Sequence, residues 1–328
     1  MEVFPMKKAL ALLLALCLCF GLLAACATEK KAEEEPTATD PTAPTEAPQF
    51  DVSPAEDDTL NILFIGHSFS YYYTNELYGM LQAAGIKARI CNLYYSGCLL
   101  EKHYEWLQTD AANYQDFITI DENGRVATGE GISLREAIAT QNWDVISLQP
   151  GIDFYNRTAA QMLTDTQEAR TGLINFLKQK FPEANMYWHQ FWAFQEGFVR
   201  DDYTVDNPNK QDIYYKEALY FAKVTCEEFD LERVNTGYAW QLVRQTGYDN
   251  LCDRLTGNDK YHDGDIGGGQ YLNACVWFEY LTGQSCINNT WRPDDCTYGE
   301  GAAYTLSEEM ITLLQEKAHT AVADRDFE

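Results

Sequence analysis

The feature that most constrains this chain is an alternation of short apolar runs with helix-like stretches. Strand-like runs occupy residues 60–66, 87–95, 143–150 and 184–192, with a weaker one at 232–237. Apolar residues recur at three-to-four spacing over the remaining stretches, 74–85, 133–141, 158–181, 210–229, 268–283 and 306–324. Parallel strands need crossovers that cover both faces of their sheet. The order therefore predicts an α/β fold, a three-layer α/β/α sandwich around a central parallel sheet of about five strands.

The amino end is expected to lie outside this domain, which we assign to residues 59–328. Lys7 and Lys8 precede a 17-residue apolar run that stops before Cys26, the pattern of an export signal over residues 1–25. The alternative, a membrane-spanning helix, needs roughly 20 apolar residues. Small residues before a cysteine also resemble a bacterial lipobox. This predicts lipidation of Cys26, with the protein exported and lipid-anchored to the bacterial cell membrane, facing outward.

Residues 26–58 are expected to form a tether after the lipidated cysteine. Residues 27–58 contain five prolines, ten acidic residues and two lysines, with almost no large apolar side chain. Such a segment cannot bury enough surface to offset the entropy of ordering it. We therefore predict a disordered linker between membrane and domain.

The charge of the chain argues against nucleic acid as a partner. Acidic residues number 50 against 24 basic ones, a formal net charge of −26. Such a field repels phosphate backbones and favours neutral substrates over polyanionic ones.

The cysteines do not form a metal-binding pattern. Seven of the ten follow Cys26, and neither a CxxC pair nor a Cys/His metal spacing occurs among them. We expect no metal and no organic cofactor. Most of the seven are interpreted as buried thiols, with a Cys286–Cys296 disulfide as an alternative.

The first strand-like run ends in a sequence suited to chemistry. It passes into Gly66-His67-Ser68, where the glycine permits a sharp turn and Ser68 lies at or near the start of a helix. A serine in that place is either a helix N-cap or a nucleophile.

A nucleophilic serine needs a base, and His262 is the best placed of the five histidines. Asp259 precedes it by three residues on a glycine-rich loop that enters a helix, so the carboxylate can orient the imidazole. The alternative for this loop is a calcium-binding turn of Asp259, Asp263 and Asp265, although it lacks the bidentate glutamate of an EF-hand.

Four short blocks in order resemble the SGNH/GDSL hydrolases: Gly66-x-Ser68, Gly97 after the second strand, Gln149 after the third, and Asp259-x-x-His262. They extend over roughly residues 60–283. The resemblance implies an SGNH/flavodoxin-like fold with Ser68 as nucleophile, His262 as general base and then acid, and Asp259 as its orienting group. It also implies an oxyanion hole from the backbone N–H groups of Ser68 and Gly97 and a side-chain amide.

This chain departs from the family pattern at two positions. His67 replaces the usual aspartate, and Gln149 replaces an asparagine, carrying the same amide on one more methylene. The GHSFS first block is closer to a less characterised, often secreted branch. We name His67, His103, His189 and Trp192 as candidate substrate-pocket residues; Trp192 lies at a strand end, where a flat ring can stack on a sugar face.

These observations predict a cell-surface serine esterase. Its substrates would be acyl esters, above all acetyl esters, on carbohydrate, and its other partner would be the membrane through Cys26. The alternative is a non-catalytic glycan- or solute-binding lipoprotein on the same fold. The sequence leaves open how residues 100–132 cover the site.

Overall fold

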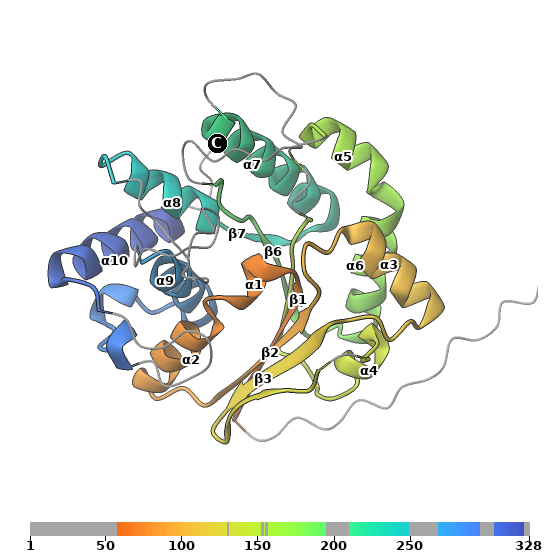
Figure 1. Ribbon diagram of the computed structural model, residues 1–328, viewed down its shortest axis with the longest axis horizontal. Coiled ribbons are helices and arrows are strands. Elements are labelled where there is room, and N and C mark those ends of the chain that lie inside the picture. Colours follow the sequence, from red (N-terminus) through yellow and green to blue (C-terminus); the bar gives the residue numbers. More distant parts are fainter. Residues whose placement is uncertain are drawn as a thin grey trace, which may run out of the picture. The chain divides into compact units, whose positions relative to one another are not determined.

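The computed structural model of the chain (Figure 1) describes residues 58–129, 131–151, 154, 157–194, 210–248, 268–295 and 305–324. The predicted signal segment, Cys26 and nearly all of the tether lie outside these ranges, as do Asp259 and His262. No helix among the described residues is long and apolar enough to cross a membrane.

A seven-stranded sheet forms the centre of the domain (Figure 1). In spatial order its strands are β4 (Gly124–Ala127), β3 (Asp116–Asp121), β2 (Ala88–Tyr94), β1 (Leu60–Gly66), β5 (Val145–Leu148), β6 (Asn185–His189) and β7 (Glu232–Val234). The last five are the predicted strands, and they pair in parallel. The predicted α/β class with a mostly parallel sheet is therefore confirmed.

The sheet differs from the prediction at one edge, where β3 and β4 form an antiparallel hairpin beside β2. The turn between them places Gly124 at φ +102°, a left-handed conformation that glycine adopts without a steric penalty. The hairpin falls in the region whose structure the sequence left open.

Helices cover both faces of the sheet (Figure 1). On one face, α2 (Thr74–Ala83), α8 (Thr236–Arg244), α9 (Gly269–Thr282) and α10 (Glu308–Ala323) contact one another. The other face carries α3 (Leu100–Thr109), α4 (Leu134–Ile138), α5 (Ala159–Asp165), α6 (Gln167–Lys180) and α7 (Lys210–Phe229). The remaining helical segments are short: α1 (Ser68–Tyr71), η1 (Cys286–Asn288) and η2 (Pro293–Asp295). This is the three-layer arrangement that the sequence predicts.

One predicted helix, 158–181, is divided at Thr166 into α5 and α6. The Thr166 hydroxyl donates to the Met162 carbonyl oxygen at 2.7 Å, and the residue leaves regular helical geometry with φ −96° and ψ 4°. Hydrogen bonding of a threonine hydroxyl to the preceding turn bends a helix. The apolar periodicity of the sequence continues through this bend, so the periodicity alone predicts one helix.

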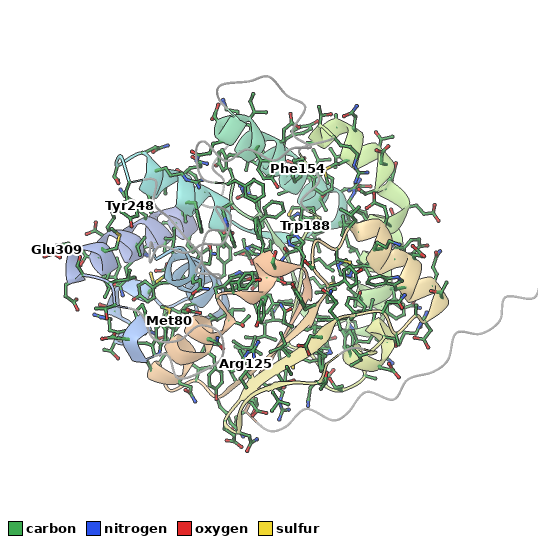
Figure 2. All side chains as sticks on the ribbon, in the orientation of Figure 1. Met80, Arg125, Phe154, Trp188, Tyr248 and Glu309 are labelled. Carbon is green, nitrogen blue, oxygen red and sulfur yellow. The ribbon has the colours of Figure 1, made fainter. Side chains whose placement is uncertain are left out.

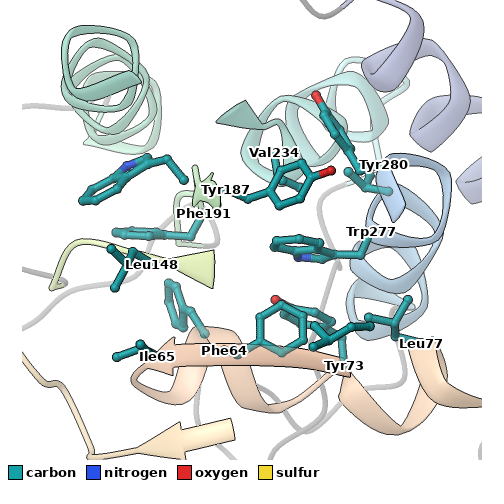
Figure 3. Close-up of a cluster of buried hydrophobic side chains, with 14 of the residues drawn as sticks. Phe64, Ile65, Tyr73, Leu77, Leu148, Tyr187, Phe191, Val234, Trp277 and Tyr280 are labelled. Carbon is teal, nitrogen blue, oxygen red and sulfur yellow. The ribbon is translucent and has the colours of Figure 1, made fainter. Parts of the chain in front are cut away.

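The core between the sheet and α9 is rich in aromatic rings (Figure 3). Phe64 and Trp277 meet edge to face at 4.9 Å between ring centroids, and Tyr73 and Tyr187 also pack against Trp277. Every residue of α9 from Gly269 to Tyr280 is buried. Such aromatic pairs add about 0.5–1.5 kcal/mol each beyond the area they bury.

The described cysteines are all free thiols, including the buried Cys286. The alternative of a disulfide between Cys286 and Cys296 is therefore not realised in the structure, and Cys296 itself lies outside the described residues.

The strand order creates a topological switch point between β1 and β5. Numbered by chain order, the parallel strands run 2-1-3-4-5 across the sheet. The chain leaves β1 toward α2 on one face and β5 toward α5 on the other (Figure 1). Ligands of open α/β sheets bind where such connections diverge, at the carboxyl ends of the strands. The fold therefore predicts a ligand site at the residues that follow Gly66 and Leu148.

Candidate functional site

Ser68 is the first residue of α1, directly after the central strand β1. His67, not Ser68, is the N-cap, because its Nδ1 accepts the N–H of Phe69 at 3.3 Å. The Ser68 hydroxyl has no hydrogen-bond partner among the described residues, and 7% of its surface is exposed. The N-cap alternative for Ser68 is thereby removed.

His67 also connects the Ser68 turn to the segment after β5. With Nδ1 accepting, the proton is on Nε2, which donates to the Pro150 carbonyl oxygen at 2.9 Å. Burial lowers the pKa of His67 to about 4, against a smaller opposing effect of the Pro150 hydrogen bond. His67 is therefore neutral at pH 7 and acts as a structural tie, which the sequence pattern did not predict.

A second serine in the same block, Ser70, is fully engaged. Its hydroxyl donates to the His67 carbonyl oxygen at 2.8 Å and accepts from Asn92 Nδ2 at 2.9 Å. The Asn92 amide also reaches the Ser70 carbonyl oxygen at 2.9 Å. These bonds fix α1 on β2 and leave Ser68 as the serine of the block whose hydroxyl is available for chemistry.

Gln149 follows β5 and lies directly over Gly66. A Cβ on Gly66 would come within 2.8 Å of the Cγ, Cδ and Nε2 atoms of Gln149, so only glycine leaves room for this side chain. Gln149 is buried, and neither its amide nitrogen nor its oxygen has a partner in the part of the chain that the structure describes. An unsatisfied buried amide costs about 1–3 kcal/mol of folding free energy, and such groups in native proteins often have a functional role.

Gly97 lies in the loop after β2, on the other side of β1. Its φ of +61° is again a left-handed conformation that suits glycine. The loop packs closely on the β5 segment: a Cβ on Gly151 would come within 2.4 Å of the Leu99 side chain and 3.0 Å of the Cys98 carbonyl oxygen. The structure thus places the loops that carry Gly97 and Gln149 against one another.

Three hydrogen-bond donors in the segments that follow adjacent strands have no acceptor among the described residues. They are the backbone N–H groups of Ser68 and Gly97 and the Nε2 amide of Gln149. They follow the adjacent strands β1, β2 and β5. Preorganised donors of this kind can stabilise a negatively charged oxygen that forms during a reaction.

The other candidate pocket residues, His103, His189 and Trp192, lie in the interior with at most 1% of their surface exposed. Burial lowers the pKa of each histidine to about 3. Trp192 stacks between Phe69 at 4.4 Å and Trp240 at 4.8 Å, so both of its faces are occupied. These three side chains are part of the buried interior and do not line an open pocket in this structure.

The fifth histidine, His319, belongs to the helical layer. Its Nδ1 contacts Glu279 Oε2 at 3.0 Å and Ser285 Oγ at 3.5 Å. Because one ring nitrogen meets both the carboxylate and the hydroxyl, the group cannot relay a proton from one to the other. No set of three or more His, Cys, Asp or Glu side chains that could hold a metal ion occurs in the part of the chain that the structure describes.

The predicted residues Asp259 and His262, together with the alternative calcium turn, lie outside the described residues. The described chain resumes at Gly268, the N-cap of α9. Near this end of α9, Asn273 Oδ1 accepts the indole N–H of Trp240 at 2.7 Å, and Trp240 stacks on Trp192. The amino end of α9 therefore lies on the same side of the sheet as α1.

The fold and site together define an open three-layer α/β domain with a serine at its switch point. The chain belongs to the family described as "Domain of unknown function (DUF4886)", whose model matches residues 61–305. The crystal structure of a DUF4886 family protein from Bacteroides uniformis shares 24% identity with a TM-score of 0.68, covering 82% of this chain and 97% of that one. This likeness shows the common fold.

Further structural neighbours include proteins described as an SGNH hydrolase from Slackia heliotrinireducens and a GDSL-like lipase from Parabacteroides merdae. A lipase/acylhydrolase from Enterococcus faecalis has 14% identity and a TM-score of 0.44, covering 68% of this chain and 96% of that one. A mutant of an acetyl-xylooligosaccharide esterase from Geobacillus Stearmophilus has 15% identity and a TM-score of 0.41, covering 67% and 92%. No curated protein sequence matches this chain.

Proposed function

We propose that this protein is a serine esterase that hydrolyses acyl esters, with acetyl groups on carbohydrate as its substrate class. The observation that carries the proposal is the set of three donors after β1, β2 and β5 that are unpaired among the described residues, together with the Ser68 hydroxyl, which is also unpaired there. A nucleophile beside preorganised donors is the arrangement that acyl transfer requires.

In the proposed reaction His262 accepts the hydroxyl proton of Ser68 as Oγ attacks the ester carbonyl carbon. The resulting oxyanion is held by the N–H groups of Ser68 and Gly97 and the amide of Gln149. The bond to the alcohol then breaks, and His262 donates its proton to the departing oxygen. Water, deprotonated by His262, hydrolyses the acyl-serine, and the proton returns to Ser68.

The position of α9 supports the assignment of His262 and Asp259. His262 precedes Gly268 by six residues in the sequence, and six residues extend to roughly 20 Å at most. The amino end of α9 lies on the α1 side of the sheet, and we propose that the preceding loop carries the imidazole to Ser68 on that side. Asp259 would orient that imidazole and stabilise its protonated form.

Active-site labelling and turnover test this proposal directly. Purified protein from residue 27 onward is treated with a fluorophosphonate and assayed on an aryl acetate, as wild type and as Ser68→Ala and His262→Ala. We expect labelling of Ser68 and losses of several orders of magnitude in kcat for both variants. Ser285→Ala and His319→Gln replace the same residue types away from the site and serve as matched controls. An unlabelled Ser68 together with turnover that neither active-site variant changes would falsify the assignment.

The second candidate function is glycan or solute binding without catalysis. The observation that favours it is the replacement of the family aspartate by His67, which the structure uses as a tie between segments. This candidate predicts sugar binding that Ser68→Ala does not weaken, with no acyl-serine formed by the wild type.

Export and anchoring form a separate proposal, supported by the apolar run and the small residues before Cys26. The protein would then act outside the membrane as a lipoprotein. Metabolic labelling with a fatty-acid analogue should mark the full chain and should be lost in Cys26→Ala. Equal labelling of both forms would contradict the assignment of Cys26.

A further inference from the structure

The surface of the α1 turn continues from Ser68 to Tyr71. The two residues are three apart on one helical turn, so their side chains project from the same side. The residues between them point elsewhere: Phe69 stacks on Trp192 in the core, and Ser70 bonds to Asn92 on β2. A substrate group next to the ester would therefore meet Tyr71.

Tyr71 belongs to a group of half-buried tyrosines. Its ring centroid lies 4.7 Å from that of Tyr72 and 5.4 Å from that of Tyr94, and each of the three side chains is partly exposed. The rings of Tyr73 and Trp192, by contrast, are fully buried. Partly exposed aromatic rings beside a reactive group provide apolar contact area together with polar hydroxyls, as ligand sites commonly do.

Arg125 belongs to the β3–β4 hairpin (Figure 2) and contacts Tyr71 of this group. Its Nη2 donates to the Tyr71 hydroxyl at 2.5 Å, and its Cζ is 5.3 Å from the centroid of the Tyr71 ring. The arginine is thus oriented by a hydrogen bond and a cation–π contact with the residue that shares a helical face with Ser68.

No carboxylate pairs with Arg125 among the described residues. Elsewhere in the domain Arg89 pairs with Asp121 at 3.3 Å and Arg157 with Glu101 at 3.0 Å. Acidic residues outnumber basic ones by 50 to 24 in this chain, so a half-buried guanidinium without an acidic partner is unusual. A guanidinium has five N–H donors and binds carboxylate or sulfate oxygens in a bidentate manner.

We propose that Tyr71 and Arg125 form a subsite that binds an anionic group, a carboxylate or a sulfate, on the sugar next to the acylated one. The proposal rests on the esterase function and names its substrate class. The net charge of the protein repels polyanions at long range, whereas Arg125 attracts one charge locally. The substrate is then a glycan with isolated charged sugars, such as single uronic acid branches, and not a densely charged polymer.

The test compares three acetylated oligosaccharides that differ in one neighbouring sugar, which is neutral, a uronate or a sulfate ester. For the wild type we expect kcat/KM to be at least tenfold higher on one of the charged esters than on the neutral one, and this comparison also identifies the preferred group. Arg125→Gln keeps a donor for the Tyr71 hydroxyl but removes the charge, and should abolish that preference. Tyr71→Phe, which loses the hydrogen bond and keeps the ring, should reduce the preference in part.

Arg135→Gln is the matched control. Arg135 also lies over an aromatic ring, with its Cζ 4.9 Å from the Phe176 centroid, but it belongs to α4 on the opposite face of the sheet. This variant should keep the wild-type preference. A wild type without preference, or an Arg125→Gln variant that loses neutral and charged esters equally, overturns the subsite.

A binding measurement separates this proposal from the esterase proposal. Calorimetric titration of wild type and Arg125→Gln with the deacetylated uronate and sulfate oligosaccharides requires no turnover. Tighter binding of a charged oligosaccharide that depends on Arg125 supports the subsite even if Ser68 proves unreactive. Equal affinity of both proteins for both charged oligosaccharides overturns it even if esterase activity is found.

Discussion

Replacing Gly66 with alanine should disable the Gln149 amide without changing any polar group. The new methyl would stand 2.8 Å from three atoms of the Gln149 side chain. Non-bonded carbon atoms rest at about 3.5–4.0 Å, so the amide must retreat by roughly 1 Å. A misplacement of about this size costs on the order of 10²-fold in rate, and loss of a whole oxyanion donor costs about 10²- to 10³-fold.

A double-mutant cycle shows whether the two positions act through one donor. We expect kcat on an aryl acetate to fall about 10²-fold in Gly66→Ala and at least as much in Gln149→Ala, in line with the costs above. If both act on the same amide, adding Gly66→Ala to Gln149→Ala costs little more, a coupling energy of about 2.7 kcal/mol. Thermal unfolding of each variant separates this effect from general destabilisation.

Gly172→Ala is a suitable control for the cycle, because its Cβ would meet the Tyr104 ring at 2.1 Å, in the α3–α6 layer, and would not touch Gln149. It should lower the melting temperature and leave kcat unchanged. If the losses in Gly66→Ala and Gln149→Ala multiply instead of overlapping, the Gln149 amide is not the group that Gly66 accommodates for catalysis, and the reasoning fails.

Two further predictions concern stability. The folded-state pKa of each buried histidine is below the unfolded value of 6.5, so the unfolded chain binds more protons than the folded one as the pH falls. Acidification from pH 6.5 to about pH 4 should therefore lower the unfolding free energy by about 1.4 kcal/mol per pH unit for each histidine. The three histidines concerned are His67, His103 and His189. Together they should change the unfolding free energy by about 4 kcal/mol per pH unit, measured by denaturant titration at several pH values, and His103→Asn should remove a third of this dependence. An unfolding free energy whose pH dependence is the same in wild type and His103→Asn would refute the low pKa of His103. Asn92→Ala removes both bonds to Ser70 and should cost about 1–3 kcal/mol of unfolding free energy, whereas an effect confined to kcat would mean that Asn92 does not hold α1 in place.

The parallel part of the fold could be read from the sequence because its strands are buried on both faces. Such strands appear as continuous apolar runs, as in residues 60–66, where six of the seven are buried. The β3–β4 hairpin has no such run, and its four-residue edge strand is partly exposed. A signal was nevertheless present, since Asn123-Gly124 is a common hairpin turn pair.

The site was predictable in its order but not in its contacts. Ser68, Gly97 and Gln149 each follow a strand, and adjacency at the carboxyl edge follows from the parallel order. The approach of Gln149 to Gly66 and the bond from His67 to Pro150 depend on packing between segments 83 residues apart. Burial likewise could not be inferred for His103, His189 and Trp192, because a polar or aromatic residue near a strand end is compatible with either the rim or the core.

The hairpin that carries Arg125 lies between β2 and β5 in the chain and at the outer margin of the sheet. Ser68, Gly97 and Gln149 instead follow interior strands, whose neighbours on both sides hold them in register. Recognition and bond cleavage would thus reside on segments with different freedom to vary. A relative could have a longer or differently charged β3–β4 hairpin and a different glycan preference, while the residues proposed for acyl transfer stayed the same.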